Sequence, residues 1–119
     1  MSQLSKNLSR AEFACKCGCG FDTVDAELVR VIQDVRDHFG EPVVISSGCR
    51  CYEHNKRVRG AARSTHLEGR GADIQVKGKT PKEVYEYLTG KYPDRYGIAW
   101  HRSFVHVDTR SNGPARWDY

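Results

Sequence analysis

The sequence predicts a small α+β domain in which helices flank a central antiparallel sheet. Two segments carry the apolar spacing of amphipathic helices, and several short runs are rich in β-branched residues, as strands are. Helices that flank several short strands are typical of the α+β class. The chain has 119 residues and shows no internal repeat or linker, which favours a single domain over residues 1–119.

The first predicted helix covers Asp25–Phe39. Its apolar residues recur every three or four positions and form one face: Leu28, Val31, Ile32, Val35 and Phe39. Gly40 and Pro42 end this helix, because glycine favours the left-handed cap and proline cannot continue the helical hydrogen bonding.

The second predicted helix begins at Thr80–Glu83, a capping box with proline at the first helical position. It ends at Gly90, and its buried face is formed by three residues: Val84, Tyr87 and Leu88. The segment Cys51–Arg59 is compatible with either a short helix or a loop.

Four short segments have the composition of strands: Val43–Ile45 within Glu41–Ser47, Gly71–Val76, Ile98–Trp100 and Phe104–Asp108. The last two form a predicted hairpin. Within Gly71–Val76, successive side chains point to opposite faces, so Asp73 and Gln75 lie opposite the apolar face.

The two ends of the chain carry weaker signals. Residues 1–24 are dense in cysteine and glycine, and we expect a loop segment packed on the domain. Residues 110–119 predict a polar tail in which Trp117 is the packing anchor.

A candidate metal site is the most specific feature of the sequence. His66 and Asp73 lie seven positions apart, and Gly69 and Gly71 between them allow a tight backbone turn. His106 follows on the last predicted strand. Two histidines and one carboxylate are usual ligands of a catalytic zinc, which keeps its fourth position for water. The spacing of His66 and Asp73 alone is compatible with a zinc site or with a plain surface hydrogen bond between them, and the zinc site is favoured once His106 and the family motifs below are considered with it.

Three motifs carry a resemblance to a known family. Ser64–Asp73 resembles the Ser-x-His-x-x-Gly-x-Ala-x-Asp signature of the zinc D-alanyl-D-alanine peptidases, with Gly71 at the alanine position. Ser46–Arg50 resembles their Ser-Gly-x-Arg segment, and Phe104–Asp108 resembles the strand that bears their last ligand. The family includes D-alanyl-D-alanine carboxypeptidases, dipeptidases and the L-alanyl-D-glutamate endopeptidases of phage endolysins. The likeness covers nearly the whole chain and implies a hedgehog-like zinc peptidase fold.

The resemblance implies a peptidase that hydrolyses peptidoglycan stem peptides with one catalytic Zn²⁺, which lowers the pKa of its bound water. Arg50 would hold a substrate carboxylate or polarise the scissile carbonyl, rather than make only a surface salt bridge. Ser64 would donate a hydrogen bond to substrate or cap a turn. Asn55 would anchor the loop behind Arg50.

The general base does not carry over by position. Relatives place an acid three residues before the last ligand or a histidine two residues before it, whereas this chain has Ser103 and Phe104 there. The nearest candidates are His101, then Asp108, with Glu68 as a third. His101 could equally be an exposed turn residue, and Asp108 could instead orient a ligand imidazole.

The cysteines form two clusters with alternate spacing: Cys15, Cys17 and Cys19, and then Cys49 and Cys51. Because five is an odd number, at least one thiol stays unpaired within the chain. A structural zinc on four thiolates, a disulfide between the clusters, and reduced buried thiols are all compatible with this spacing.

Composition limits the partners and the compartment. The formal net charge is +4, and no apolar run approaches the ~20 residues of a membrane helix. The N-terminus does not resemble a signal peptide. We expect a monomer made in the cytoplasm that acts on the bacterial wall after release by a holin or on a virion, as a phage-type lysin.

Two other functions remain as alternatives. One is a non-catalytic zinc-containing module of the same fold that binds cell wall or is structural, which the missing family base favours. The other is a nucleic-acid-binding zinc protein built on the cysteines and on the basic residues near Lys56–Arg59 and Arg63. It lacks a recognisable zinc finger and an aromatic–basic stacking pattern, so no nucleic acid is expected. The sequence does not distinguish a carboxypeptidase from an endopeptidase.

Overall fold

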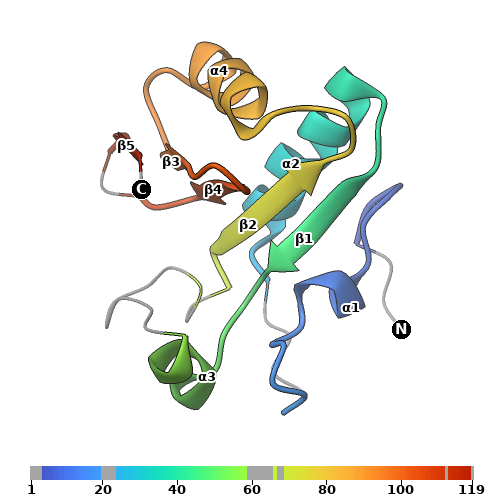
Figure 1. The fold of residues 1–119 in the computed structure, drawn as a ribbon, viewed down its shortest axis with the longest axis vertical. Coiled ribbons are helices and arrows are strands. Elements are labelled where there is room, and N and C mark those ends of the chain that lie inside the picture. Colours follow the sequence, from blue (N-terminus) through green and yellow to red (C-terminus); the bar gives the residue numbers. More distant parts are fainter. Residues whose placement is uncertain (1–3, 20–23, 59–65, 67–68, 112, 119) are drawn as a thin grey trace.

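A computed structural model describes residues 4–19, 24–58, 66, 69–111 and 113–118 (Figure 1). The helices are α1 (Arg10–Phe13), α2 (Ala26–Phe39), α3 (Tyr52–Arg57) and α4 (Pro81–Lys91). The strands are β1 (Val43–Ser47), β2 (Gly71–Val76), β3 (Gly97–Trp100), β4 (Val105–Asp108) and β5 (Ala115–Asp118). The predicted α+β class is confirmed.

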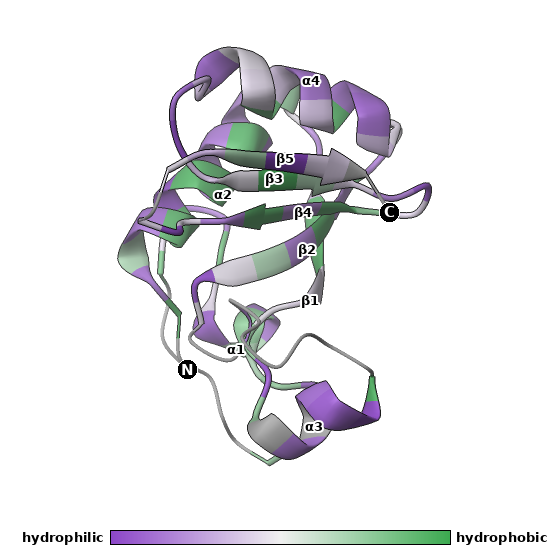
Figure 2. Cartoon of the chain, turned by 90° about the vertical axis from the view of Figure 1, so that its left-hand side faces the viewer, coloured by the Kyte–Doolittle hydropathy of each residue, from purple (hydrophilic) through white to green (hydrophobic). Residues whose placement is uncertain are grey.

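The five strands form one sheet in the order β1-β2-β4-β3-β5, which Figure 2 shows from the β5 edge down to β1. The β1–β2, β2–β4 and β3–β4 pairs are antiparallel, as predicted, but β5 pairs with β3 in parallel. The sheet is therefore mixed: its central strands are antiparallel, as expected, and the predicted polar tail adds a parallel strand at one edge. Trp117 lies on this added strand, opposite Ala99 of β3.

The two long helices, α2 and α4, begin at the positions that the sequence predicts for them. Asp25 caps α2 by accepting a hydrogen bond from the Leu28 amide, and Gly40 ends it in the left-handed region at φ 66°. The α4 capping box is present, because Thr80 and Glu83 each accept from the backbone N–H of the other. The Cys51–Arg59 segment, left open above, contains the short helix α3.

The hydrophobic core lies on one face of the sheet. Helix α2 packs on β1 and β2, and α4 packs on β3 and β4. The strands contribute their inward residues to this core: Ile45, Ala72, Ile74, Val76, Ile98, Val105 and Val107. Because side chains alternate along a strand, the intervening residues Asp73, His106 and Asp108 lie on the opposite face, away from both helices.

The N-terminal segment was expected to be a loop but contains helix α1, which starts with a Ser9–Glu12 capping box. Leu8 and Phe13 join the same core as the long helices. A Cβ at Gly48 would lie 2.5 Å from the Phe13 carbonyl oxygen, so glycine is required where the two segments cross. The crossing brings the residues after α1 beside the residues that lead into α3.

Candidate metal centre

Three buried side chains converge on the open face of the sheet. Asp73 of β2 and His106 of β4 are direct partners in the strand register, and His66 lies in the loop before β2. Asp73 Oδ1 is 3.0 Å from His106 Nδ1 and 3.3 Å from His66 Nε2. A tetrahedral zinc bound about 2.1 Å from each atom would separate such ligands by about 3.4 Å. The two measured separations are close to this value, and one donor atom from each of the three residues lies within 4.8 Å of the other two.

The outer atom of each ligand candidate is held by a further group. His66 Nδ1 donates to the Gly48 carbonyl at 2.5 Å, because a carbonyl oxygen can only accept. His106 Nε2 lies 2.8 Å from Asp108 Oδ2, and Arg50 Nη2 donates to Asp73 Oδ2 at 3.5 Å. The Gly48 contact places a hydrogen on His66 Nδ1 and leaves His66 Nε2 toward Asp73 Oδ1, whereas both ring nitrogens of His106 lie beside carboxylates, Nδ1 beside Asp73 and Nε2 beside Asp108.

The electrostatics of the cluster keep its carboxylate ionised. Burial acts to raise the pKa of Asp73, but hydrogen bonds from His106 and His66 outweigh it and hold that pKa well below its usual range. Burial lowers the pKa of His106, whereas Asp108 and Asp73 raise it more. An ionised carboxylate between two imidazoles is a donor set suited to Zn²⁺.

Asp108 is fully buried beside His106, and both of its oxygens are engaged. Oδ1 accepts from the Gly97 amide at 3.1 Å and from Arg110 Nε at 2.8 Å, while Oδ2 accepts from Arg110 Nη2 at 2.8 Å. A Cβ at Gly97 would collide with this carboxylate. Burial acts to raise the pKa of Asp108, but Arg110 and His106 outweigh it and hold the pKa low. The geometry fits a residue that orients His106, the second of the two roles considered for it.

Sequence reasoning missed the groups that hold Asp108. Arg110 forms a two-bond pair with it and also lies over the Trp117 ring, 5.2 Å from its centroid. The position of Arg110 two residues after Asp108 was the only hint of this pair in the sequence. The hint becomes meaningful only once Asp108 is known to be buried.

Arg50 lies beside the cluster. Its Nε donates to Ser47 Oγ at 3.2 Å and its Nη1 to Asn55 Oδ1 at 3.1 Å, in addition to the Asp73 contact. Its backbone N–H donates to the His66 carbonyl at 2.8 Å. The structure thus brings the predicted substrate-binding arginine to the predicted metal ligands.

Of the three proton-transfer candidates, the structure describes Asp108 and His101. His101 lies in the β3–β4 turn, where it stacks on Phe104 with ring centroids 4.7 Å apart. Its Nδ1 accepts from the Ser103 amide at 3.1 Å, so the neutral ring carries its hydrogen on Nε2. Ser64 and Glu68, the remaining predicted site residues, lie outside the described residues.

The sequence model of the family described as Peptidase M15 matches residues 6–108. This span contains His66, Asp73, His106 and Arg50. The chain belongs to the peptidase M15 family. A search of the curated proteins gives no match.

Membership of the M15 family confirms the resemblance to zinc peptidases of the D-alanyl-D-alanine carboxypeptidase type. M15 peptidases are zinc-dependent, and the His66–Asp73–His106 group can supply the ligands. Among the residues that the structure describes, no helix is both long and apolar enough to cross a bilayer.

Proposed function

We propose that this M15 peptidase hydrolyses peptide bonds in peptidoglycan stem peptides, with one Zn²⁺ held by His66 Nε2, Asp73 Oδ1 and His106 Nδ1. The observation that carries the proposal is the convergence of these three atoms from buried side chains whose outer atoms are held by Gly48, Arg50 and Asp108. When bound, zinc would supply a Lewis acid and lower the pKa of a water molecule.

Arg50 binds the substrate in this proposal. The side chain is 14% exposed, so a substrate carboxylate or the scissile carbonyl can approach it beside the metal ligands. Stem peptides carry carboxylates, and a guanidinium pairs with a carboxylate through two parallel hydrogen bonds.

His101 is the proposed proton-transfer residue. With Nδ1 occupied by the Ser103 amide, the neutral ring presents only Nε2–H, so His101 can take up a proton only after Nδ1 is released from that amide, and the resulting imidazolium can then return the proton to the leaving amine. We predict that His101→Ala lowers the kcat for wall peptides by about 10²–10⁴-fold with zinc retained. Unchanged kinetics would exclude His101, and Glu68→Gln is then the next variant to measure.

Digestion of purified peptidoglycan tests the function. Zinc-loaded protein should release peptide fragments that a matched His66→Ala protein does not release, and fragment masses identify the bond. Loss of a terminal D-alanine indicates a carboxypeptidase, and a cut after L-alanine indicates an endopeptidase. We further propose that the protein acts as a phage-type lysin, so it should lower the turbidity of cells whose walls are accessible from outside.

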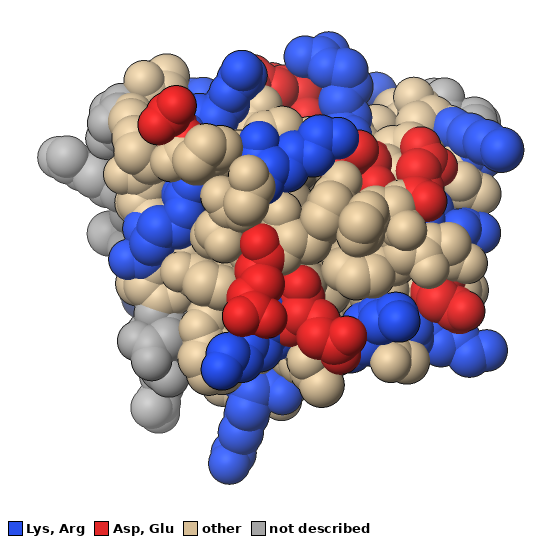
Figure 3. Space-filling view, turned by 90° about the horizontal axis from the view of Figure 1, so that it is seen from above, with Lys and Arg blue, Asp and Glu red and all other residues tan. Residues whose placement is uncertain are grey.

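The non-catalytic alternative rests on Ser103 and Phe104, which stand where relatives carry their base. It predicts zinc bound at the His66 site and no fragments from any wall peptide. A nucleic-acid partner is not proposed, because the sequence lacks a recognisable zinc finger and an aromatic–basic stacking pattern. On the face that Figure 3 shows, basic and acidic side chains are interspersed.

A further inference from the structure

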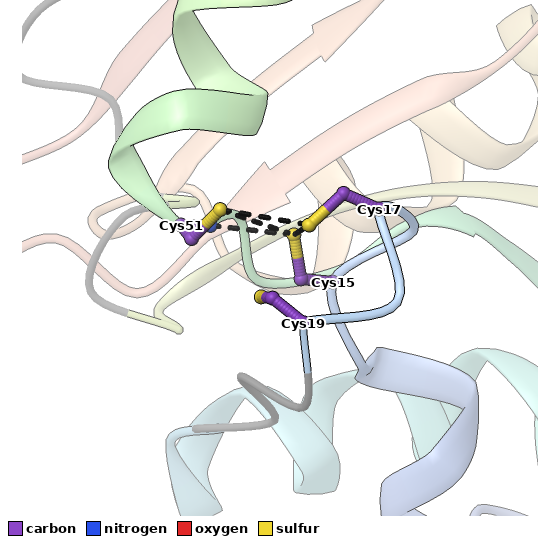
Figure 4. A group of neighbouring side chains, drawn as sticks. All are labelled: Cys15, Cys17, Cys19 and Cys51. Atoms are coloured by element: carbon purple, nitrogen blue, oxygen red, sulfur yellow. Dashed lines mark hydrogen bonds between the residues drawn. The ribbon is translucent and has the colours of Figure 1, made fainter.

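Four of the five cysteines gather at a place separate from the His66 cluster. Cys15, Cys17 and Cys19 follow α1, and Cys51 lies directly before α3 (Figure 4). The Sγ atoms of Cys15 and Cys17 are 3.4 Å apart, and Cys51 Sγ lies 3.8 and 3.7 Å from them. All four sulfur atoms lie within 4.8 Å of one another.

These separations match a metal tetrathiolate. A tetrahedral zinc with Zn–S bonds of about 2.3 Å places its sulfurs about 3.8 Å apart. A disulfide would need a sulfur–sulfur distance of about 2.05 Å, and the five cysteines are all free thiols. The Sγ atom of Cys19, the fourth thiol, lies within 4.8 Å of the other three.

The backbone holds the two segments in register. Phe13 O accepts the Cys49 amide at 2.9 Å, and the Cys51 amide donates to Cys15 Sγ at 3.4 Å. Gly18, at φ 83°, closes a turn by donating its backbone N–H to the Cys15 carbonyl. Cys17 and Cys19 are the neighbours of Gly18 in this turn. An amide N–H directed at a sulfur favours its thiolate form.

The fifth cysteine lies apart from this group. Cys49 is buried, and its thiol donates to the Phe13 carbonyl at 3.1 Å. Cys49 is therefore a structural thiol and the other four cysteines are potential metal ligands. The alternate spacing in the sequence did not distinguish Cys49 from the others.

We propose that Cys15, Cys17, Cys19 and Cys51 form a second metal site that binds Zn²⁺ as a tetrathiolate. Four soft sulfur ligands without an open position are typical of structural zinc sites. Binding releases the four thiol protons and leaves the complex with a charge of two minus. Cys17 and Cys19 are exposed, which gives the ion a path into the site.

The proposed site would join the N-terminal segment to the residues beside the first metal centre. Cys51 follows Arg50, and Gly48, which holds His66, lies three positions earlier. The ion would thus close the loop between Cys15 and Cys51 and fix the backbone that carries Gly48 and Arg50. It shares no ligand with the first centre, so the two sites can be tested separately.

Cobalt substitution provides the test, because cobalt–thiolate sites show charge-transfer absorption that histidine–carboxylate sites lack. Reduced protein freed of metal is loaded with Co²⁺, and bound metal is counted per chain. We expect two equivalents in the unmodified protein. The His66→Ala protein should keep one equivalent and the charge-transfer band, and Cys17→Ser/Cys19→Ser should keep one equivalent without the band.

Cys49→Ser is the matched control and should keep both equivalents and the band, because Ser retains a donor for Phe13. Absence of the band from both the unmodified and the His66→Ala proteins would overturn the proposal, even if the double cysteine variant failed to fold. A disulfide that forms in place of metal binding during aerobic loading would also overturn it. Neither result depends on peptidase activity, so failure of this site and failure of the proposed function are distinguishable.

Discussion

Asp73 and His106 face each other across the β2–β4 pairing, with Asp73 Oδ1 3.0 Å from His106 Nδ1. The register of two antiparallel strands therefore sets this pair, and only His66 reaches it from a loop. Because strands position side chains more rigidly than loops do, this pair would form the rigid part of the proposed zinc site, and His66 would be the third ligand.

Asp73→Asn should remove zinc from this centre. The amide keeps the shape of the side chain but loses the charge that balances the ion, so we expect bound zinc to fall by one equivalent and peptidase activity to be lost. Metal analysis after dialysis measures the change, with Asp94→Asn, an exposed residue, as the control. Full zinc content in Asp73→Asn would contradict the assigned ligand set.

Asp108→Asn separates the two roles considered for Asp108. If Asp108 orients His106, the variant should bind zinc about 10- to 100-fold more weakly and recover much of its activity at saturating zinc. If Asp108 were the base, kcat would fall while zinc affinity stayed unchanged. Zinc titrations with a competing chelator, together with kcat at saturating metal, distinguish the two.

Arg50→Lys tests the substrate contact. Lysine keeps the charge but loses the paired N–H groups, so kcat/KM for wall peptides should fall roughly 10- to 100-fold with zinc retained. Arg57→Ala, an exposed residue of α3, is the control and should change little. Equal kinetics for the lysine and wild-type proteins would remove Arg50 from substrate binding.

Asp34 provides a pH-dependent stability test away from the metal centre. Burial acts to raise its pKa, but hydrogen bonds from Lys91 at 2.8 Å and Tyr87 at 2.6 Å outweigh it, so the pKa is lowered. A lowered folded-state pKa gives stability above the unfolded pKa of about 4, and this stability is lost as pH falls through the folded value.

Asp34→Asn should therefore lower the Tm by roughly 2–4 °C near neutral pH, since the pair is partly exposed and screened by solvent. The difference from wild type should shrink as the pH falls below about 4. Thermal melts across that range measure it, with Asp37→Asn one turn away as the control. A constant Tm difference at all pH values would exclude the ion pair as the cause.

Local signals predicted most of the secondary structure. The α2 face, the Gly40 cap and the Thr80–Glu83 box depend on neighbouring residues, and the structure follows them. The short helix α1 also had such a signal, a Ser9–Glu12 capping box, that the cysteine- and glycine-rich composition obscured. Strand β5 had none, because a segment such as Ala115–Asp118 becomes a strand only through its pairing with β3.

The sequence likewise predicted one part of the candidate site and not another. The resemblance to the zinc peptidases, together with the residue types His66, Asp73 and His106, indicated which side chains would meet. The sequence could not show that Arg110 and Gly97 hold Asp108, because those contacts depend on strand pairing and burial. Likewise, the separation of Cys49 from the other cysteines depends on how the N-terminal segment crosses Gly48.

Removal and return of zinc shows whether the protein needs the metal to hydrolyse stem peptides. Purified peptidoglycan is incubated with protein freed of metal by a chelator, then with the same protein after zinc is restored, and the products are analysed by mass spectrometry. We expect no fragments without metal, stem-peptide fragments after zinc is restored, and none from His66→Ala under either condition. Fragments released by the metal-free protein, or by His66→Ala, would contradict the proposed zinc dependence.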